Sequence, residues 1–491
     1  MARTFRTRDP NFEPDIIVIG SGMAGLCTAS LLSRYGNKVM VLEQHDEVPG
    51  GSMHSFKLGS EWVCSGWHYI GKLIGPTRLV WNELTDYQQM LHDPQEVFDT
   101  NHGVGSLTAT NFEQKMMIKL SEFDRITKYC NFLVLVKLLW WPLAWCVWAI
   151  YVLFGFRREV CMPYGEWCKK VSGQSKEHEI WWTQRGDHGM KREETIAIVG
   201  GVICDHYCRG VSHVDGGITE TVRRICERIK SRGGCVLIQA PVQEIVVDNG
   251  AVRGVRVHGQ FIAAKQVVCS NVFTAANLLK PPPEEFRYAL TCGPSAAHGC
   301  VFMSITGKRP SDLGLPSGNV WIDDKWFISH KESPTGTVVY IIWQSPYFPR
   351  GGDYESRKDR VTQEALNEIC KIFPKLKECT QDTDSSTPAT TEHYLASQLG
   401  CSYGLAMEKR RFGEYKMVRA LSPETTVPGL FLTGQDVMFP GIIGAMMDGV
   451  LTAQVIAHPG WRGLFHNVVS DIAADAKARK SREEQEAKKD K

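Results

Sequence analysis

The chain has 491 residues, of which 43% are hydrophobic and 22% charged, a composition typical of globular proteins and not of disordered or collagen-like ones. Lysine plus arginine (56) nearly balances aspartate plus glutamate (54), which leaves a net charge of +2 and no extended basic stripe. We therefore expect no nucleic-acid partner, since such binding needs a concentrated positive surface. The length predicts two to four domains at roughly 150 residues each.

Sixteen cysteines are scattered along the chain rather than gathered in a short framework. Residues 1–14 are basic and polar, without the apolar run of a secretory signal, and no Asn-x-Ser/Thr sequon occurs. We therefore expect reduced thiols and a chain that faces the cytosol. Cys204 and Cys208 have no matching ligands in the sequence, so we expect no metal site.

The first organised segment is a complete βαβ unit. A strand-like run at 15–19 leads into Gly20-Ser21-Gly22-Met23-Ala24-Gly25, a helical pattern follows, and a second strand-like run ends at Glu43. The glycines let the backbone turn tightly and approach a pyrophosphate, which the helix start attracts through its N–H groups and its dipole. Glu43 stands where an acid accepts hydrogen bonds from a ribose 2′-hydroxyl. The unit predicts a Rossmann-type dinucleotide site.

Two further elements favour FAD over NAD. Gly50-Gly51 and then Ser52 follow Glu43 closely, and their amides and hydroxyl are placed to meet more of a long cofactor. Near the C-terminal end, an apolar strand at 429–432 leads into Thr433-Gly434-Gln435-Asp436, and a helix with small residues on one face opens at Gly441. This turn and helix start predict a contact to the flavin or its ribityl chain.

The pattern predicts one cofactor domain assembled from three parts, at 15–75, 214–275 and 425–460. In the second part, Gly216-Gly217 opens an amphipathic helix, a strand starts at Cys235, and a meander of antiparallel strands is expected from Val242 to Val268. Residues 76–213 and 276–424, which include a predicted strand at 337–343, form a substrate region, and 461–491 form a charged tail. The predicted class is α/β, with a Rossmann-type domain interleaved with a mixed α+β domain.

Residues 138–156 form an uncharged run rich in tryptophan and bounded by Lys137 and Arg157. Length and hydropathy alone are typical of a transmembrane helix. A complete crossing would leave parts of one nucleotide-binding domain on opposite sides of a bilayer, where they could not assemble. We therefore expect a monotopic insertion or a hairpin broken at Pro142, with a buried helix that lines a pocket as the alternative.

Motifs along most of the chain resemble the superfamily of phytoene desaturases, carotenoid isomerases and retinol saturases, and its retinol saturase branch in particular. They are Gly20–Gly25, Leu42–His45, Gly50-Gly51, Gly66–Gly71, Gly186–Met190, Asp205–Tyr207, Gly216-Gly217 and Thr433–Asp436. The resemblance implies a fold like that of amine oxidases and phytoene desaturases. It also implies non-covalent FAD held at Ser21, Ala24, Glu43, Gly51, Ser52, Val242 and Asp436. One departure is Val63-Cys64-Ser65-Gly66, where the branch usually carries Phe-Asp-Thr-Gly.

The resemblance implies hydride exchange between flavin and a conjugated carbon of a polyene or isoprenoid lipid, with saturation of a retinoid- or carotenoid-like substrate as the leading prediction. Saturation also needs a proton donor. His68 and Tyr69 are the candidates, with packing roles as the alternative, and Asp205 and His206 are secondary candidates. No second glycine-rich unit followed by an acid occurs, so we expect an external electron donor or acceptor.

Two other functions stay open. A carotenoid isomerase or a desaturase would use the same site, whereas Rab GDP-dissociation inhibitors share this fold, carry lipids and hold no flavin. Glu43, Gly50-Gly51 and the turn at 434–436 together favour a flavin enzyme. The final residues, 488–491, resemble a dilysine retrieval signal. With the apolar run at 138–156, they predict a cytosol-facing enzyme embedded in one leaflet of the endoplasmic reticulum membrane.

Overall fold

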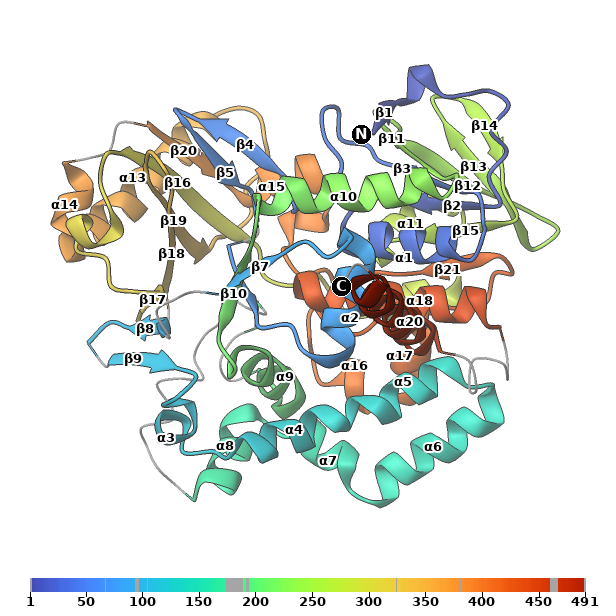
Figure 1. Cartoon of the computed structure of the whole chain (residues 1–491), viewed down its shortest axis with the longest axis horizontal. Helices are drawn as coiled ribbons and strands as arrows, with labels where there is room; N and C mark the ends of the chain where they lie inside the picture. The colour runs from blue at the N-terminus through green and yellow to red at the C-terminus, as the bar shows by residue number, and fades with distance from the viewer. Residues whose placement is uncertain are drawn as a thin grey trace.

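Two sheets and a layer of helices form the architecture of the chain (Figure 1). The structure is a computed structural model that describes residues 2–66, 68–92, 97–103, 105–173, 189–190, 194–323, 325–378, 382–459 and 467–489. One sheet is six-stranded and parallel, and the other is seven-stranded and mainly antiparallel. This arrangement confirms the predicted α/β class, a Rossmann-type domain interleaved with a mixed α+β region.

The parallel sheet is built from strands that lie far apart in the sequence. Its order is β1 (Arg3–Thr4), β11 (Cys235–Ile238), β3 (Val39–Leu42), β2 (Ile16–Ile19), β15 (Gln266–Cys269) and β21 (Leu430–Leu432). One face is covered by α1 (Met23–Arg34), α10 (Gly217–Ser231) and α18 (Gly441–Ala457). The other face packs on α11 (Val272–Leu278), α12 (Glu284–Ala289) and the meander. Burial on both faces explains why β2 and β3 are continuous apolar runs.

The meander contains β12 (Val242–Asp248), β13 (Ala251–Val257) and β14 (Gln260–Ala263), all antiparallel. The prediction that it continues through Val268 is wrong, because β15 leaves it and joins the parallel sheet between β2 and β21. The burial patterns give the reason. Strand β14 exposes three of its four residues, whereas β15 is buried as an inner parallel strand requires.

The seven-stranded sheet belongs to the predicted substrate region. Its order is β20 (Asp382–Ser386), β16 (His298–Thr306), β19 (Gly336–Gln344), β18 (Trp326–Glu332), β17 (Asn319–Ile322), β8 (Val97–Asn101) and β9 (Gly105–Thr108). Strand β19 confirms the strand predicted at 337–343. Helices α13 (Tyr354–Ile372) and α14 (Pro374–Lys377) cover one face. The hairpin of β4 (Ser55–Leu58) and β5 (Glu61–Cys64) packs on the other face.

A helical layer runs along the lower edge of the molecule in Figure 1. It contains α4 (Leu120–Lys128), α5 (Cys130–Leu138), α6 (Trp141–Leu153), α7 (Phe156–Val160), α8 (Tyr164–Ser172) and α9 (Ala197–Tyr207). Helices α16 (Arg410–Gly413) and α17 (Tyr415–Ala420) pack on α7 and α5. A three-stranded sheet of β6 (Ile70–Gly71), β10 (Val211–Val214) and β7 (Met90–His92) lies between this layer and the two large sheets.

The apolar run at 138–156 contains the last residue of α5, the whole of α6 and the first residue of α7. Helix α5 ends at Leu138, and α6 begins at Trp141 with Pro142 in its first turn, where the missing N–H of proline costs little. Across the described part of the chain, we find no helix with both the length and the apolar character that a membrane crossing requires. Helices α5 and α6 pack on each other as a hairpin whose bend lies just before Pro142.

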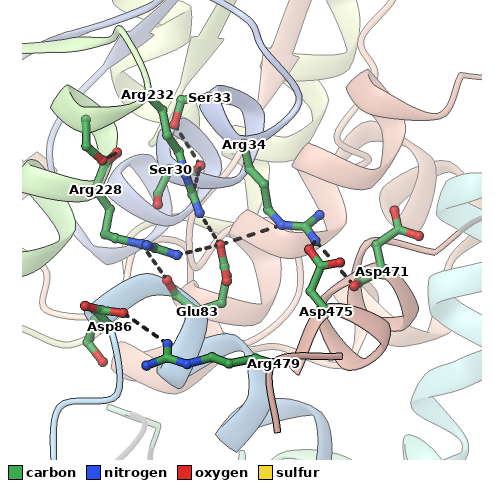
Figure 2. A network of polar contacts seen from close by, with 12 residues as sticks. Ser30, Ser33, Arg34, Glu83, Asp86, Arg228, Arg232, Asp471, Asp475 and Arg479 are labelled. Carbon is green, nitrogen blue, oxygen red and sulfur yellow. Dashed lines mark hydrogen bonds and ion pairs between the residues drawn. The ribbon is translucent and has the colours of Figure 1, made fainter. Parts of the chain in front are cut away.

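Helices α2 (Gly75–Thr85) and α20 (Val468–Lys489) pack on the cofactor domain rather than on the substrate region. Their junction is polar (Figure 2). The partly buried Glu83 carboxylate pairs with Arg228 at 3.1 Å, Arg34 at 3.7 Å and Arg232. Asp471 of α20 accepts a hydrogen bond from the Tyr35 hydroxyl at 2.6 Å. Part of the predicted charged tail therefore forms a docked helix.

We expect Glu83→Gln to lower the free energy of unfolding by about 2 to 4 kcal/mol, because it leaves three arginines facing one another without their shared anion. The matched control is Asp86→Asn, whose exposed pair with Arg479 at 3.6 Å contributes about 0 to 1 kcal/mol. Urea unfolding followed by tryptophan fluorescence measures both. An equal loss of unfolding free energy in the two variants would show that the Glu83 cluster stabilises the protein no more than an exposed ion pair does.

Candidate functional site

The glycine-rich turn joins the end of β2 to the start of α1. Gly20 has a φ of +94°, and a Cβ added there would lie 2.3 Å from Ser270 Oγ. A Cβ on Gly25 would lie 2.1 Å from the carbonyl oxygen of Gly20. At Gly22, the N-cap of α1, an added Cβ meets nothing within 4 Å. The turn is therefore closed on its protein side and open beside the N-terminus of α1, where a phosphate is favoured.

The carboxylate of Glu43 joins the glycine turn to the loop after β3 at the carboxyl edge of the sheet. Its Oε2 accepts hydrogen bonds from the backbone N–H of Ser21 at 2.9 Å and from the Ser21 hydroxyl at 2.5 Å. Its Oε1 accepts from the N–H of His45 at 2.9 Å. The Ser21 hydroxyl in turn accepts from the N–H of Gly50 at 2.8 Å. The structure thus brings together Ser21, Glu43 and the second glycine pair, as a dinucleotide site requires.

Other predicted cofactor residues surround this group. Gly51 has a φ of +59°, and a Cβ on it would lie 3.1 Å from the Cα of Gly22. The carbonyl of Ser52 accepts from the Ser65 hydroxyl at 3.2 Å. Val242 starts β12, two residues after Ala240, whose N–H donates to the carbonyl of Glu43 at 2.8 Å. Ala24, in the first turn of α1, is buried and faces Gly449 of α18.

The turn after β21 lies next to Ser270, as the glycine-rich turn does. Gly434 has a φ of +99°, and a Cβ on it would lie 2.2 Å from the carbonyl oxygen of Ser270. The buried carboxylate of Asp436 accepts hydrogen bonds from the N–H of Val272 at 3.0 Å and of Leu405 at 2.7 Å. The side chain of Asp436 therefore links the turn to two other segments of the chain. This role is structural and does not depend on a cofactor.

His68 and Tyr69 lie in an aromatic setting before β6. The His68 ring lies 4.3 Å from the ring of Tyr340, and its Nδ1 has no hydrogen-bond partner among the described residues. Burial, and to a smaller extent His213, lower the pKa of His68 to about 4. The imidazole is therefore neutral near pH 7. Tyr69 is buried, with its ring 5.3 Å from the ring of Tyr207.

The secondary candidates Asp205 and His206 are engaged elsewhere. His206 Nε2 accepts from the N–H of Gly71 at 3.0 Å, and burial lowers the pKa of His206 to about 4. Asp205 forms an ion pair with Arg209 at 3.6 Å, while burial and Asp124 raise the pKa of its carboxyl. The His206 contact ties α9 to β6, whereas the Asp205 contact is local to the end of α9. Residues 186–188 of the Gly186–Met190 motif lie outside the described part of the chain.

The departure at 63–66 places a cysteine where the resembling branch carries an acid. The N–H of Cys64 donates to the Tyr340 hydroxyl at 3.1 Å, so the backbone at this position is held by the same tyrosine that faces His68. The geometry of the segment is therefore maintained without a carboxylate. The described cysteines, Cys64 among them, form no disulfide, and the described residues contain no cluster able to hold a metal ion.

Sequence reasoning missed several buried polar residues next to the turn at 433–436. Arg411 donates to the carbonyls of Gln435 at 3.1 Å and Asp436 at 2.9 Å. Asp448 accepts from the N–H of Met438 at 3.2 Å. Asp448 carried a signal, because it is the only charged residue in α18. Arg411 carried none, because it sits in a basic triplet that is typical of a solvated surface.

Comparisons with known proteins agree with this geometry. A family model described as FAD dependent oxidoreductase (DAO) matches residues 15–391. An all-trans-retinol 13,14-reductase from Rattus norvegicus is 25% identical over 94% of this chain and 87% of its own. A prolycopene isomerase from Daucus carota is 26% identical over 91% of this chain and 80% of its own. These relatives confirm the predicted resemblance to the retinol saturase and carotenoid isomerase superfamily.

Two further matches bear on activity and on the fold. An inactive all-trans-retinol 13,14-reductase from Danio rerio is 26% identical over 90% of this chain and 85% of its own, so identity does not separate active from inactive relatives. The solved structure of a putrescine oxidase with putrescine bound has a TM-score of 0.64 and 15% identity, covering 90% of this chain and 99% of that one. This likeness confirms the predicted amine oxidase-like fold.

We expect Glu43→Ala to weaken FAD binding by about 1 to 3 kcal/mol, because it removes a buried acceptor that both orders the glycine turn and can bind the ribose. Glu47→Ala, an exposed acid of the same loop, is the matched control and should leave binding unchanged. Titration of the apoprotein with FAD, followed by flavin fluorescence, measures both. Wild-type affinity in the Glu43 variant would remove this residue from the cofactor site.

Proposed function

Because the chain belongs to the FAD dependent oxidoreductase family, we propose that it saturates a carbon–carbon double bond of a lipophilic conjugated polyene, a retinoid or a carotenoid-like isoprenoid. The observation that carries the proposal is the continuous cofactor edge formed by the glycine turn, Glu43 and the turn at 434–436. The names of the relatives supply the substrate class, since they act on retinol and prolycopene and align over at least 90% of this chain. The family also favours an enzyme over a flavin-free lipid carrier.

The residues present fit FAD. Gly22 leaves open space at the N-terminus of α1, and the buried Glu43 lies beside it at the end of β3. The residues that would hold FAD are Gly20, Ser21, Gly22, Ala24, Gly25, Glu43, Gly51, Ser52, Val242, Gly434 and Asp436. When bound, FAD supplies hydride transfer to or from a conjugated carbon. The protein then has to position the polyene, exclude water and deliver a proton.

We assign proton delivery to the Tyr69 hydroxyl and orientation to His68. A neutral imidazole with a pKa of about 4 holds no spare proton at pH 7, so His68 is suited to a hydrogen bond rather than to acid catalysis. Tyr69 lies next to it among the rings of Tyr207 and Phe327, at 5.3 and 6.1 Å, a setting that suits a flat conjugated chain. The electrons come from an external donor.

The test is anaerobic mixing of the flavin-reduced holoenzyme with all-trans-retinol and, separately, with a cis-carotenoid, followed by mass spectrometry of the product. Saturation adds two hydrogens to the substrate and oxidises the flavin. An unchanged mass with altered double-bond geometry would instead assign the isomerase function that the Daucus carota relative suggests. No product from either substrate would overturn both assignments.

We expect Tyr69→Phe and His68→Ala each to slow the single-turnover rate by roughly 10- to 100-fold with FAD still bound. Between about pH 5 and 8 the wild-type rate should show no ionisation of His68, because this group takes up its proton only near pH 4. His258→Ala, on an exposed turn of the meander, is the control. Unchanged rates in both site variants would assign the two residues to packing.

We further propose that the enzyme associates with the cytosolic face of the endoplasmic reticulum membrane through the hairpin of α5 and α6. The apolar side chains that face solvent there are Leu135, Trp140, Trp141, Leu143, Trp145, Ile150, Val152, Leu153 and Phe154, of which Leu153 is 81% exposed. Arg157 and Arg158 are exposed beside them and suit anionic headgroups. Membrane contact gives a lipophilic substrate a direct route. Residues 490–491 of the dilysine-like end lie outside the described part of the chain.

We expect the replacement of Trp140, Trp141, Leu153 and Phe154 by serine to weaken binding to phosphatidylcholine vesicles by about tenfold or more, since each exposed apolar side chain adds buried area. Trp62→Ser is the matched control, because this tryptophan is 67% exposed on β5, far from the hairpin in Figure 1. Vesicle flotation measures both variants. A wild-type chain that stays wholly in the soluble fraction would contradict the proposed membrane contact.

A further inference from the structure

Arg411 is a buried cation next to the turn that follows β21. Its side chain is almost wholly buried on the short helix α16. Its guanidinium donates to the carbonyl oxygens of Leu405 at 2.9 Å, Gln435 at 3.1 Å, Asp436 at 2.9 Å and Met438 at 3.5 Å, and to the sulfur of Met407 at 2.8 Å. A single side chain therefore gathers three carbonyls of the segment 435–438.

The same segment is held from its N–H side by an acid. The Oδ2 of the buried Asp448 accepts hydrogen bonds from the N–H groups of Met438 at 3.2 Å and Phe439 at 3.3 Å. The N–H of Val437 closes the turn onto the carbonyl of Gly434 at 2.8 Å. With its carbonyls directed at Arg411 and its amides directed at the carboxyl group of Asp448, the turn is held in one conformation. The N–H of Asp436 and the carbonyl of Gln435 belong to one trans peptide unit and point in opposite directions. Because that carbonyl points toward Arg411, the N–H of Asp436 points away from it.

A turn can be held without charges, and burial of a guanidinium costs several kcal/mol before its hydrogen bonds form. Arginine stays protonated even when buried. The segment next to Gly434 therefore lies beside a permanent positive charge in a region of low dielectric, where charge interactions reach further than in water. The carboxyl groups that interact with this cation include Asp436, whose oxygens accept hydrogen bonds from the N–H groups of Val272 and Leu405, and Asp448, whose pKa is raised well above its usual range by burial. Reduction of a bound flavin adds negative charge, so a fixed cation nearby favours the reduced form.

We propose that Arg411 is a positioning residue for the flavin, which fixes the turn at 434–438 and raises the reduction potential of the bound cofactor through its charge. The inference rests on the proposed FAD site. Its two parts depend on different properties of the side chain. The shape of the turn depends on hydrogen-bond donors, whereas the reduction potential depends on the positive charge.

Three substitutions separate these two properties. Arg411→Lys keeps the charge and loses the planar fork, Arg411→Gln keeps donors and loses the charge, and Arg411→Met loses both. We expect the two neutral variants to shift the two-electron flavin equilibrium toward the oxidised form by about tenfold, which corresponds to about 30 mV. The lysine variant should keep the wild-type potential and bind FAD more weakly. Arg410→Met, at the neighbouring and more exposed arginine, should change neither property.

The measurement is anaerobic titration of each holoprotein against a reference dye, with FAD affinity determined in parallel. Should Arg411→Met fail to fold, Arg411→Gln decides the outcome. A wild-type potential in a neutral variant that still holds FAD would overturn the inference and leave Arg411 a purely structural residue. A wild-type chain that holds no flavin would overturn the proposed function together with this inference, so the two failures are distinguishable.

Discussion

The buried carboxylate of Glu43 is the interaction on which the cofactor edge depends. A charge with 6% exposure is tolerable only because three N–H and O–H donors, from Ser21 and His45, satisfy it. Those donors belong to the glycine turn and to the loop after β3, and the Ser21 hydroxyl extends the contact to Gly50. Removal of this carboxylate would release the glycine turn and the loop after β3 at once. The rigidity that a dinucleotide site needs thus comes from one side chain.

A second convergence point joins parts of the chain that are distant in sequence. Gly20 and Gly434 both approach Ser270 more closely than any side chain would allow. Because β2, β15 and β21 are adjacent parallel strands, their carboxyl ends meet at one edge, and the three loops that follow compete for the same volume. Glycine at 20 and 434 resolves that competition. The positive φ of both residues shows that the backbone, and not only the space, requires glycine.

The sequence was informative where function depends on local backbone geometry. Glycines, the acid at the end of β3 and the small residues of α18 are requirements of a turn, a hydrogen-bonded link between two loops and a close helix pair, so each leaves a local pattern. Arg411, Lys137 and His206 could not be read in this way. Lys137 stands at the edge of an apolar run and Arg411 in a basic triplet, and both settings suggest an exposed side chain. Both are buried because they donate hydrogen bonds to carbonyls of other segments. The acceptor role of His206 likewise depends on Gly71, which pairs with it only in three dimensions.

Tertiary hydrogen bonds also limit how the apolar hairpin can meet a membrane. Lys137 of α5 donates to the carbonyls of Val418 at 2.8 Å and Leu421 at 2.9 Å, and the Tyr151 hydroxyl of α6 donates to the carbonyl of Phe412 at 3.2 Å. Insertion of the whole hairpin would pull these groups into hydrocarbon without their partners, at a cost of several kcal/mol for the ammonium alone. The hairpin must therefore stay on the protein body, and only its exposed face can enter the lipid. Because Phe412 follows Arg411 in α16, the apolar hairpin and the turn at 434–438 are held by the same short helix.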